Sequence, residues 1–328
     1  MISKSRTRVA VIGGGISDEH DVSLASAASV VRAVGALGFA AEALTIGTDG
    51  RWRTADGQRV SASEAVERLA ACDLAFPVLH GIDGEDGAIA GLLRMTRIPF
   101  VGSPVRAGAL GMDKWATKLV AEDLGIATAR GALAGGWAAP VGTAFASELR
   151  PPFVVKPTTG GSSNGVFVVA DRVDLAATVE QARAFGETVL VEEYVRGREI
   201  DIAVFRDASG ALRTGSTLEI GVVPGGVFDR AEKYDGSAEF TLPAPLDSRW
   251  ETAIRRAAVL LYEALGCGGV ARFDFFLTPD AVVLNEVNTS PGMTEQSQVP
   301  RMFAATGLDY ADLVGELIAA AREEHRPR

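Results

Sequence analysis

The stretch "ARFDFFLTPDAVVLNEVN", residues 271–288, contains two apolar runs typical of β-strands, separated by a Thr-Pro-Asp turn. Side chains alternate between the two faces of a strand, so Arg272 and Asp274 share a face of the first run. Glu286 and Asn288 share a face of the second run for the same reason. Burying such polar groups without partners costs on the order of several kcal/mol each. The two strands must therefore supply partners for these side chains or bind a ligand.

The oxygen atoms of Asp274, Glu286 and Asn288 are of the kind that Mg²⁺ prefers, and Mg²⁺ completes its coordination with water and phosphate. The alternative is a salt-bridge network of Arg272, Asp274 and Glu286 that stiffens the edge of the sheet. These residues alone favour the two interpretations almost equally. The choice between them depends on the rest of the sequence.

Three lysines are spaced so that they can reach a chain of phosphates. Lys114 follows a turn in "GMDK", Lys156 ends the apolar run "PPFVV", and Lys233 lies in "DRAEKY". Most lysines in proteins are solvated surface residues, but Lys156 follows an apolar run where an exposed face is not expected. We therefore predict that these three lysines bind phosphate.

A glycine-rich loop, "TTGGSSNG" at residues 158–165, separates two further β-like runs. Glycine allows a close approach of the backbone, and exposed N–H groups bind phosphate, so the loop suits a lid over phosphates. The segment "VLVEEYVRGRE" then supplies Glu192, Glu193 and Glu199 as acceptors for the exocyclic amine of adenine and for a ribose. With the lysines and the carboxylates, these segments predict ATP and magnesium.

Strands and helices alternate in the first hundred residues, which is typical of a parallel sheet with helices on both faces. The elements expected there are strands at 8–12, 40–46 and 73–79 and helices at 22–37, 61–71 and 85–95. Later segments form antiparallel β pairs, with helices expected at 113–124, 249–265 and 310–321. We predict an α/β domain at residues 1–103 and α+β domains at residues 104–195 and 196–328.

The composition argues against several classes of partner. The chain of 328 residues has a formal net charge of −10 and no long basic run, so we expect neither nucleic acid nor an anionic membrane as a partner. No window approaches the length of a transmembrane span, and the N-terminus does not resemble a secretory signal. Two cysteines without CxxC spacing fit free thiols in a reducing compartment. We expect a cytoplasmic protein that acts on small molecules.

Two motifs resemble those of other protein classes, but the residues around each motif do not fit that class. The stretch "VAVIGGGISDEHDVSLASA", residues 9–27, begins like a dinucleotide-binding loop, but Asp18 stands where the third glycine is needed. Its Ser17 and Ser23 are expected to cap the following helix. The sequence "GSSNG" would make Ser163 the nucleophile of a hydrolase, but that turn requires a following helix, and β-like residues follow here.

Seven segments, in this order, resemble the D-alanine-D-alanine ligases of the ATP-grasp superfamily. They are "GGGISDEHDVSLASA", "LHGIDGEDG", "PFVGSPVRAGALGMDK", "VVKPTTGGSSNGV", "EKY", "ARFDFF" and "NEVNTSPGMT". The resemblance covers nearly the whole chain. It implies the ATP-grasp fold, in which two α+β domains enclose ATP, and a homodimer.

The resemblance also implies a role for each residue that matches a family motif. Glu19, linked to Ser162 and Tyr234, would hold the ammonium of the first D-alanine, and Arg272 with the N–H of Gly292 would form the oxyanion site. The implied ATP-binding residues are Lys114, Lys156, Ser163, Glu192, Glu193, Val195, Glu199 and Lys233. The implied substrate-binding residues are Glu19, His80, Ser297 and Gln298, and the implied ligands of two Mg²⁺ ions, for which Mn²⁺ can substitute, are Asp274, Glu286 and Asn288.

The implied reaction joins two D-alanines through an acyl phosphate, for the synthesis of a peptidoglycan precursor. Gln298 replaces a residue that is usually apolar in the family, which leaves open a related ligase with D-serine or another amino acid as acceptor. Tyr234 stands where relatives that form esters carry phenylalanine, so an amide product is favoured. A nicotinamide-dependent oxidoreductase and a non-catalytic ATP-binding regulator are the alternatives from other classes.

Overall fold

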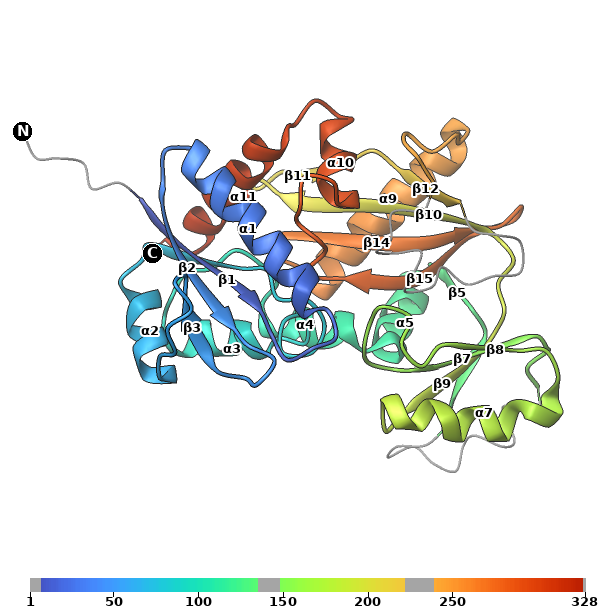
Figure 1. Cartoon of the computed structure of the whole chain (residues 1–328). Helices are drawn as coiled ribbons and strands as arrows, with labels where there is room; N and C mark the ends of the chain where they lie inside the picture. The colour runs from blue at the N-terminus through green and yellow to red at the C-terminus, as the bar shows by residue number, and fades with distance from the viewer. Residues whose placement is uncertain (1–6, 135–147, 222–238, 327–328) are drawn as a thin grey trace, which may run out of the picture.

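The computed structural model describes residues 7–134, 148–221 and 239–326 (Figure 1). The first part is a four-stranded sheet of order β3-β2-β1-β4. Its strands are β1 (Arg8–Gly14), β2 (Ala40–Ile46), β3 (Trp52–Thr54) and β4 (Leu74–Pro77). β1 pairs in parallel with β2 and β4, as the alternating pattern predicts, whereas β3 adds an antiparallel strand that the sequence did not indicate.

Three helices accompany this sheet, namely α1 (His20–Ala36), α2 (Ala62–Ala70) and α3 (Ala88–Met95). α2 begins at Ser61, whose hydroxyl accepts the N–H of Glu64 in an ordinary N-cap. α1 begins differently, because its N-cap Glu19 makes no side-chain capping hydrogen bond. The carboxyl of Glu19 is therefore engaged elsewhere.

The prediction that Ser17 and Ser23 cap α1 is wrong. The hydroxyl of Ser17 donates to the carbonyl of His80 at 2.7 Å, and that of Ser23 donates to the carbonyl of Val78 at 2.6 Å. Ser17, in the loop before α1, and Ser23, in the first turn of α1, thus tie this part of the chain to the segment that follows β4. Spacing from the helix start could not show this, because the partners lie more than fifty residues away.

A second, antiparallel sheet has the order β6-β9-β7-β8. Its strands are β6 (Gly131–Ala134), β7 (Phe153–Pro157), β8 (Phe167–Val169) and β9 (Val189–Glu193), and α7 (Leu175–Ala182) packs on it. β7 and β8 form the predicted hairpin, with Phe153 opposite Val169. The hairpin holds the glycine-rich loop at its tip.

The third sheet has seven strands, in the order β13-β12-β10-β14-β15-β5 with β11 paired to β10. They are β5 (Ala127–Thr128), β10 (Arg198–Arg206), β11 (Leu212–Thr214), β12 (Leu218–Gly221), β13 (Glu239–Thr241), β14 (Val270–Leu277) and β15 (Val282–Asn288). All neighbours are antiparallel except β15 and β5. The predicted mixture of α/β and α+β architecture is confirmed.

The other α-helices of the described residues are α4 (Val105–Met112), α5 (Lys114–Asp123), α9 (Ser248–Leu265), α10 (Gln298–Ala304) and α11 (Tyr310–Glu324). α4, α5 and α9 pack on β15, while α10 and α11 pack on β10. α4, α7 and α10 are short and are not among the helices expected from the sequence. Among the helices that the structure describes, none is long and apolar enough to cross a membrane.

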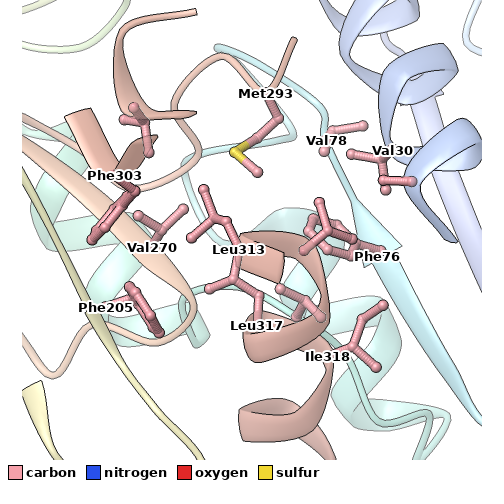
Figure 2. Packing of buried hydrophobic residues seen from close by; sticks show 14 of the residues in the cluster. Val30, Phe76, Val78, Phe205, Val270, Met293, Phe303, Leu313, Leu317 and Ile318 are labelled. Atoms are coloured by element: carbon pink, nitrogen blue, oxygen red, sulfur yellow. The ribbon is translucent and has the colours of Figure 1, made fainter. Parts of the chain in front are cut away.

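One hydrophobic core joins the first sheet to the third (Figure 2). Val30 of α1 and Phe76 of β4 lie on one side of α11, and Phe205 of β10 lies on the other. Leu313 and Leu317 of α11 fill the space between them and are 1% exposed or less. The last helix of the chain therefore fixes the first sheet against the sheet that carries the polar strands.

Candidate active site

A cavity of about 760 Å³ is lined by residues of all three sheets and their loops. It collects every predicted site residue that the structure describes. These are Glu19, His80, Lys114, Lys156, Ser162, Ser163, Glu192, Glu193, Val195, Glu199, Arg272, Asp274, Glu286, Asn288, Gly292, Ser297 and Gln298. The predicted residues Lys233 and Tyr234 lie outside the described residues.

The polar residues of β14 and β15 lie opposite one another in the sheet, and each pair shares a face of its strand as the spacing predicts. In the register of the two strands Arg272 lies opposite Asn288 and Asp274 opposite Glu286. Two guanidinium nitrogens of Arg272 donate to the two carboxylate oxygens of Asp274, each at 2.7 Å. The amide of Asn288 donates to Asp274 at 2.9 Å. Asp274 is therefore the centre of this polar group.

A third carboxylate on this face was not expected from the sequence. Asp201 of β10 lies opposite Asp274, and its Oδ2 is 3.6 Å from Nε of Arg272. This oxygen is buried and makes no hydrogen bond. Burial and the charge of Asp274 raise the pKa of Asp201 well above its ordinary value. The sequence "REIDIAVF" could have indicated this carboxylate. Asp201 interrupts an apolar strand there and shares a face with Glu199, two residues before it.

The chemistry of this group fits magnesium. Asp274, Glu286 and Asn288 offer two carboxylates and an amide oxygen, a partial set that leaves room for water and phosphate. Among the described residues, no three His, Cys, Asp or Glu side chains are grouped to hold a metal by themselves. In the present arrangement Arg272 supplies the positive charge at Asp274, so a cation there would compete with the guanidinium.

Two loops from distant parts of the chain meet over the cavity. The hydroxyl of Ser162, in the glycine-rich loop, donates to the carboxylate of Glu19. The amide of Asn164 donates to Asp18 at 3.1 Å, so the residue that breaks the dinucleotide fingerprint contacts this loop. Ser162 and Ser163 both have positive φ, a conformation that is uncommon outside glycine. The residues with this uncommon backbone lie where the glycine-rich loop contacts Asp18 and Glu19.

Gly81 gives Glu19 the room it needs. Its φ is +71°, and a Cβ there would lie 3.1 Å from a carboxylate oxygen of Glu19 and 3.2 Å from Cβ of Ser17. A larger residue would therefore meet both a backbone penalty and a crowded neighbour. The first glycine of "LHGIDGEDG" is therefore required because the carboxylate of Glu19 packs against it.

His80 lines the cavity, but both of its ring nitrogens have protein partners. Nδ1 lies 2.7 Å from the carbonyl of Ser290, which can only accept, so Nδ1 carries a proton. Nε2 lies 3.0 Å from the hydroxyl of Ser26, which itself accepts the N–H of Met293. Burial lowers the pKa of His80. The neutral imidazole therefore joins α1 to the loop after β15, close to Gly292.

Glu85 also lines the cavity, although it is not among the site residues predicted from the sequence. One of its oxygens accepts the N–H of Gly81 at 3.1 Å, so the carboxyl holds the loop beneath Glu19. Desolvation and the charge of Glu19 raise the pKa of Glu85 to about 8. In the sequence, Glu85 is the first acid of "GEDG", residues 84–87, at the end of the segment "LHGIDGEDG".

A buried group of charges lies on the wall formed by the second sheet. Lys156 of β7 donates to one oxygen of Glu192 at 2.7 Å. Lys118 of α5 donates to the other at 2.7 Å. Glu193, the next residue of β9, accepts the N–H of Arg150 at 3.0 Å and lies 3.6 Å from Arg130. Its carboxylate is thus engaged apart from that of Glu192.

Lys114 begins α5 at the mouth of the glycine-rich loop. Its Nζ donates to the carbonyl of Gly160 at 2.7 Å and lies 3.8 Å from Glu286. Lys114 therefore lies between this loop and the carboxylates of the third sheet. This is a suitable place for a cation that binds a phosphate chain.

The loop after β15 brings Gly292, Ser297 and Gln298 to the cavity. The hydroxyl of Ser297 accepts the N–H of Thr294 at 3.1 Å and makes no capping bond to α10. Gln298 is the first residue of α10. These residues form the end of the cavity that lies beside α10.

Models of one protein family match most of the chain. Residues 8–103 match the model described as the D-ala D-ala ligase N-terminus, and residues 137–319 match the D-ala D-ala ligase C-terminus. A "D-alanine--D-alanine ligase" of Mycobacterium sp. (strain KMS) is 38% identical over 98% of both chains. A relative of the same description from Rhodococcus jostii (strain RHA1) is 37% identical, again over 98% of both chains.

Solved structures with the same fold are also found. The VanG D-Ala:D-Ser ligase from Enterococcus faecalis has a TM-score of 0.85 and 32% identity, over 97% of this chain and all of that one. The D-alanine-D-alanine ligase from Coxiella burnetii has a TM-score of 0.82 and 27% identity, over 98% and 95%. The similarity therefore extends over all three sheets.

Proposed function

The chain belongs to the D-alanine-D-alanine ligase family, and we propose from its site that it joins two D-alanines to D-alanyl-D-alanine at the cost of ATP. One observation carries this proposal. A single cavity brings the family motifs of all three sheets together, and the Ser162–Glu19 hydrogen bond connects two of them. The product is a precursor of peptidoglycan.

The chemistry begins with a carboxylate, which is a poor electrophile. We propose that Glu19 holds the ammonium of the first D-alanine, whose carboxylate attacks the γ-phosphate of ATP to give an acyl phosphate and ADP. Lys114 and Lys156 bind the phosphates and stabilise their charge. Magnesium, held by Asp274, Glu286 and Asn288, would supply further charge neutralisation at the same oxygens.

The amine of the second D-alanine then attacks the carbonyl of the acyl phosphate. Arg272 and the N–H of Gly292 stabilise the negative oxygen of the tetrahedral intermediate, each donor contributing about 3 kcal/mol. Phosphate leaves, the amine loses a proton, and an amide remains. The glycine-rich loop excludes water, which would otherwise hydrolyse the acyl phosphate.

The finer parts of the proposal concern the nucleotide and the assembly. Further ATP-binding residues in this proposal are Ser163, Glu192, Glu193, Val195, Glu199 and Lys233. Tyr234 would act with Glu19 and Ser162 in catalysis. The domain limits 1–103, 104–195 and 196–328, the homodimer, the use of two metal ions and the cytoplasmic location belong to the same proposal. Light scattering after gel filtration tests the dimer.

A second candidate differs only in the acceptor. Gln298 lines the cavity where an apolar residue is usual, and a similar structure is that of a D-Ala:D-Ser ligase. His80, Ser297 and Gln298 would form the substrate-binding end. A polar amide there favours an acceptor with a hydroxyl group.

The experiment is phosphate release with a panel of D-amino and D-hydroxy acids, the products being identified by mass. The proposal expects the homodipeptide from D-alanine alone. A preference for D-alanyl-D-serine in mixtures, lost in Gln298→Leu, would support the second candidate. A lack of any dipeptide from D-alanine would contradict the main proposal.

A further inference from the structure

Lysine is rare in this chain, which makes each one informative. Of the 32 basic residues only Lys4, Lys114, Lys118, Lys156 and Lys233 are lysines, and the others are arginines. Three of the five are phosphate-binding residues in the proposed function. Lys118, which is 4% exposed, has no part in it. A buried lysine in an arginine-rich chain calls for an explanation.

Lys118 and Lys156 bind the same carboxylate from two sides. Their Nζ atoms lie 2.7 Å from Oε1 and Oε2 of Glu192, respectively. Lys118 also donates to the carbonyl of Ala129, so its ammonium is held between α5 and the loop that follows β5. Glu192 and Lys156 are 5% and 6% exposed, and the three charges therefore interact with little screening by water.

One lysine would be enough to neutralise the charge of Glu192, yet two lysines contact it. Lys156 lines the cavity and, in the proposed function, binds phosphate of the nucleotide. If Lys156 turned to phosphate and Lys118 were absent, Glu192 would be left as a buried carboxylate without a cation, a strongly unfavourable state. With Lys118 in place, Glu192 keeps one cation while Lys156 is free to move.

We propose that Lys118 is a positioning residue that holds Glu192 as an ionised acceptor for the exocyclic amine of the nucleotide base, and so makes the site select adenine. The inference rests on the proposed ATP-dependent function. It adds to that function the residue that sets the base selectivity.

The ionisation state of Glu192 is what distinguishes the bases. An ionised carboxylate only accepts, so it pairs with an amine and repels a carbonyl oxygen. A protonated carboxyl can donate to such an oxygen and would tolerate a 6-oxo purine. Burial favours the protonated form of Glu192, but Lys156 and Lys118 outweigh it and keep its pKa below the ordinary value.

The experiment compares ATP with inosine triphosphate, which carries an oxygen in place of the exocyclic amine. Dissociation constants of both nucleotides are measured by calorimetry with magnesium and without D-alanine. The variants are Lys118→Met, Glu192→Gln and the double variant. Arg130→Met is the matched control, because Arg130 lies beside Glu193, the neighbour of Glu192 on β9.

Wild type should prefer ATP over inosine triphosphate by about tenfold or more, as expected for a hydrogen bond to a charged group. Lys118→Met should weaken ATP binding and abolish most of this preference while the affinity for inosine triphosphate changes little. The double variant should lose no more preference than Glu192→Gln alone, and Arg130→Met should keep it.

Equal weakening of both nucleotides in Lys118→Met would overturn the inference, because a structural role predicts that result. An unchanged preference would overturn it as well. If Lys118→Met does not fold, Lys118→Arg provides the test, since it keeps the charge and should retain the preference. D-alanine-dependent phosphate release by wild type, measured on the same preparation, separates a failure of this inference from a failure of the proposed function.

Discussion

At the scale of single residues, Arg272 and Asp274 form the closest ion pair of the polar strands. The guanidinium binds both oxygens of Asp274 and lies 3.6 Å from the buried Asp201. The two acids raise the pKa of Arg272 in spite of its burial, so the arginine stays charged. Replacing it by an uncharged residue would leave two buried carboxylates without a cation, which is destabilising.

The conservative variant Arg272→Lys therefore tests the reaction rather than the fold. It keeps a positive charge but loses the planar fork of donors. We expect dipeptide formation to fall by about 10²- to 10³-fold, the typical effect of losing an oxyanion donor. ATP binding measured by calorimetry should stay within a few-fold of wild type, and a parallel loss of ATP binding would mean that Arg272 is misplaced here.

Glu85 gives a prediction about pH. Its pKa is raised to about 8 in the folded protein, so the folded state binds a proton that the unfolded state releases above about pH 4.5. Stability should therefore decline as the pH rises from about 4.5 towards 8. Glu85→Gln should remove this contribution, and its advantage over wild type in denaturant titrations should grow between pH 5 and pH 8. An advantage that shrinks over this range would contradict the assignment.

At the scale of elements, the glycine-rich loop between β7 and β8 lies against the first loop through Ser162–Glu19 and Asn164–Asp18. The second contact is exposed and lies at the rim. It is therefore expected to affect closure of the loop more than the chemistry beneath it.

Asp18→Ala should consequently allow water to reach the acyl phosphate. We expect more than one phosphate to be released per dipeptide, measured by phosphate release and product mass in one assay. Asp123→Ala, at the exposed end of α5, is the control and should keep the ratio at one. A ratio of one in both variants would show that the Asn164–Asp18 contact does not exclude water.

Much of this arrangement could be predicted where one residue pattern decides the structure. Period two placed Arg272 with Asp274 on one face of their strand, and Glu286 with Asn288 on one face of theirs. The register of the structure brings the two pairs opposite one another. Short elements such as β3 and α10 carry too few residues for a pattern. Ser17, Lys118 and Asp201 depend on partners in other elements, and no local rule in the sequence names such partners.

At the scale of the molecule, α11 connects the first and third sheets through the core of Figure 2. A cavity in this helix should therefore weaken the contact between the sheet that carries Glu19 and the sheet that carries Arg272. The shared core makes the geometry of the active site depend on residues far from it.

Leu317→Ala should lower the free energy of unfolding by about 3 kcal/mol, as for other fully buried leucines. Leu119→Ala on α5 is the matched control, because Leu119 is 50% exposed and its loss should cost less than about 0.5 kcal/mol. Urea titrations of both variants provide the comparison. Equal stability of the two variants would contradict the role given to α11.

The central claim is that the chain activates one D-alanine through an acyl phosphate and joins it to a second. The direct test uses D-alanine labelled with ¹⁸O at both carboxylate oxygens, with ATP and magnesium, and mass analysis of the dipeptide and the phosphate. The account predicts D-alanyl-D-alanine that has lost one label from its peptide carbonyl group, and one labelled oxygen in each phosphate. Unlabelled phosphate, or ATP hydrolysis without dipeptide, would contradict it.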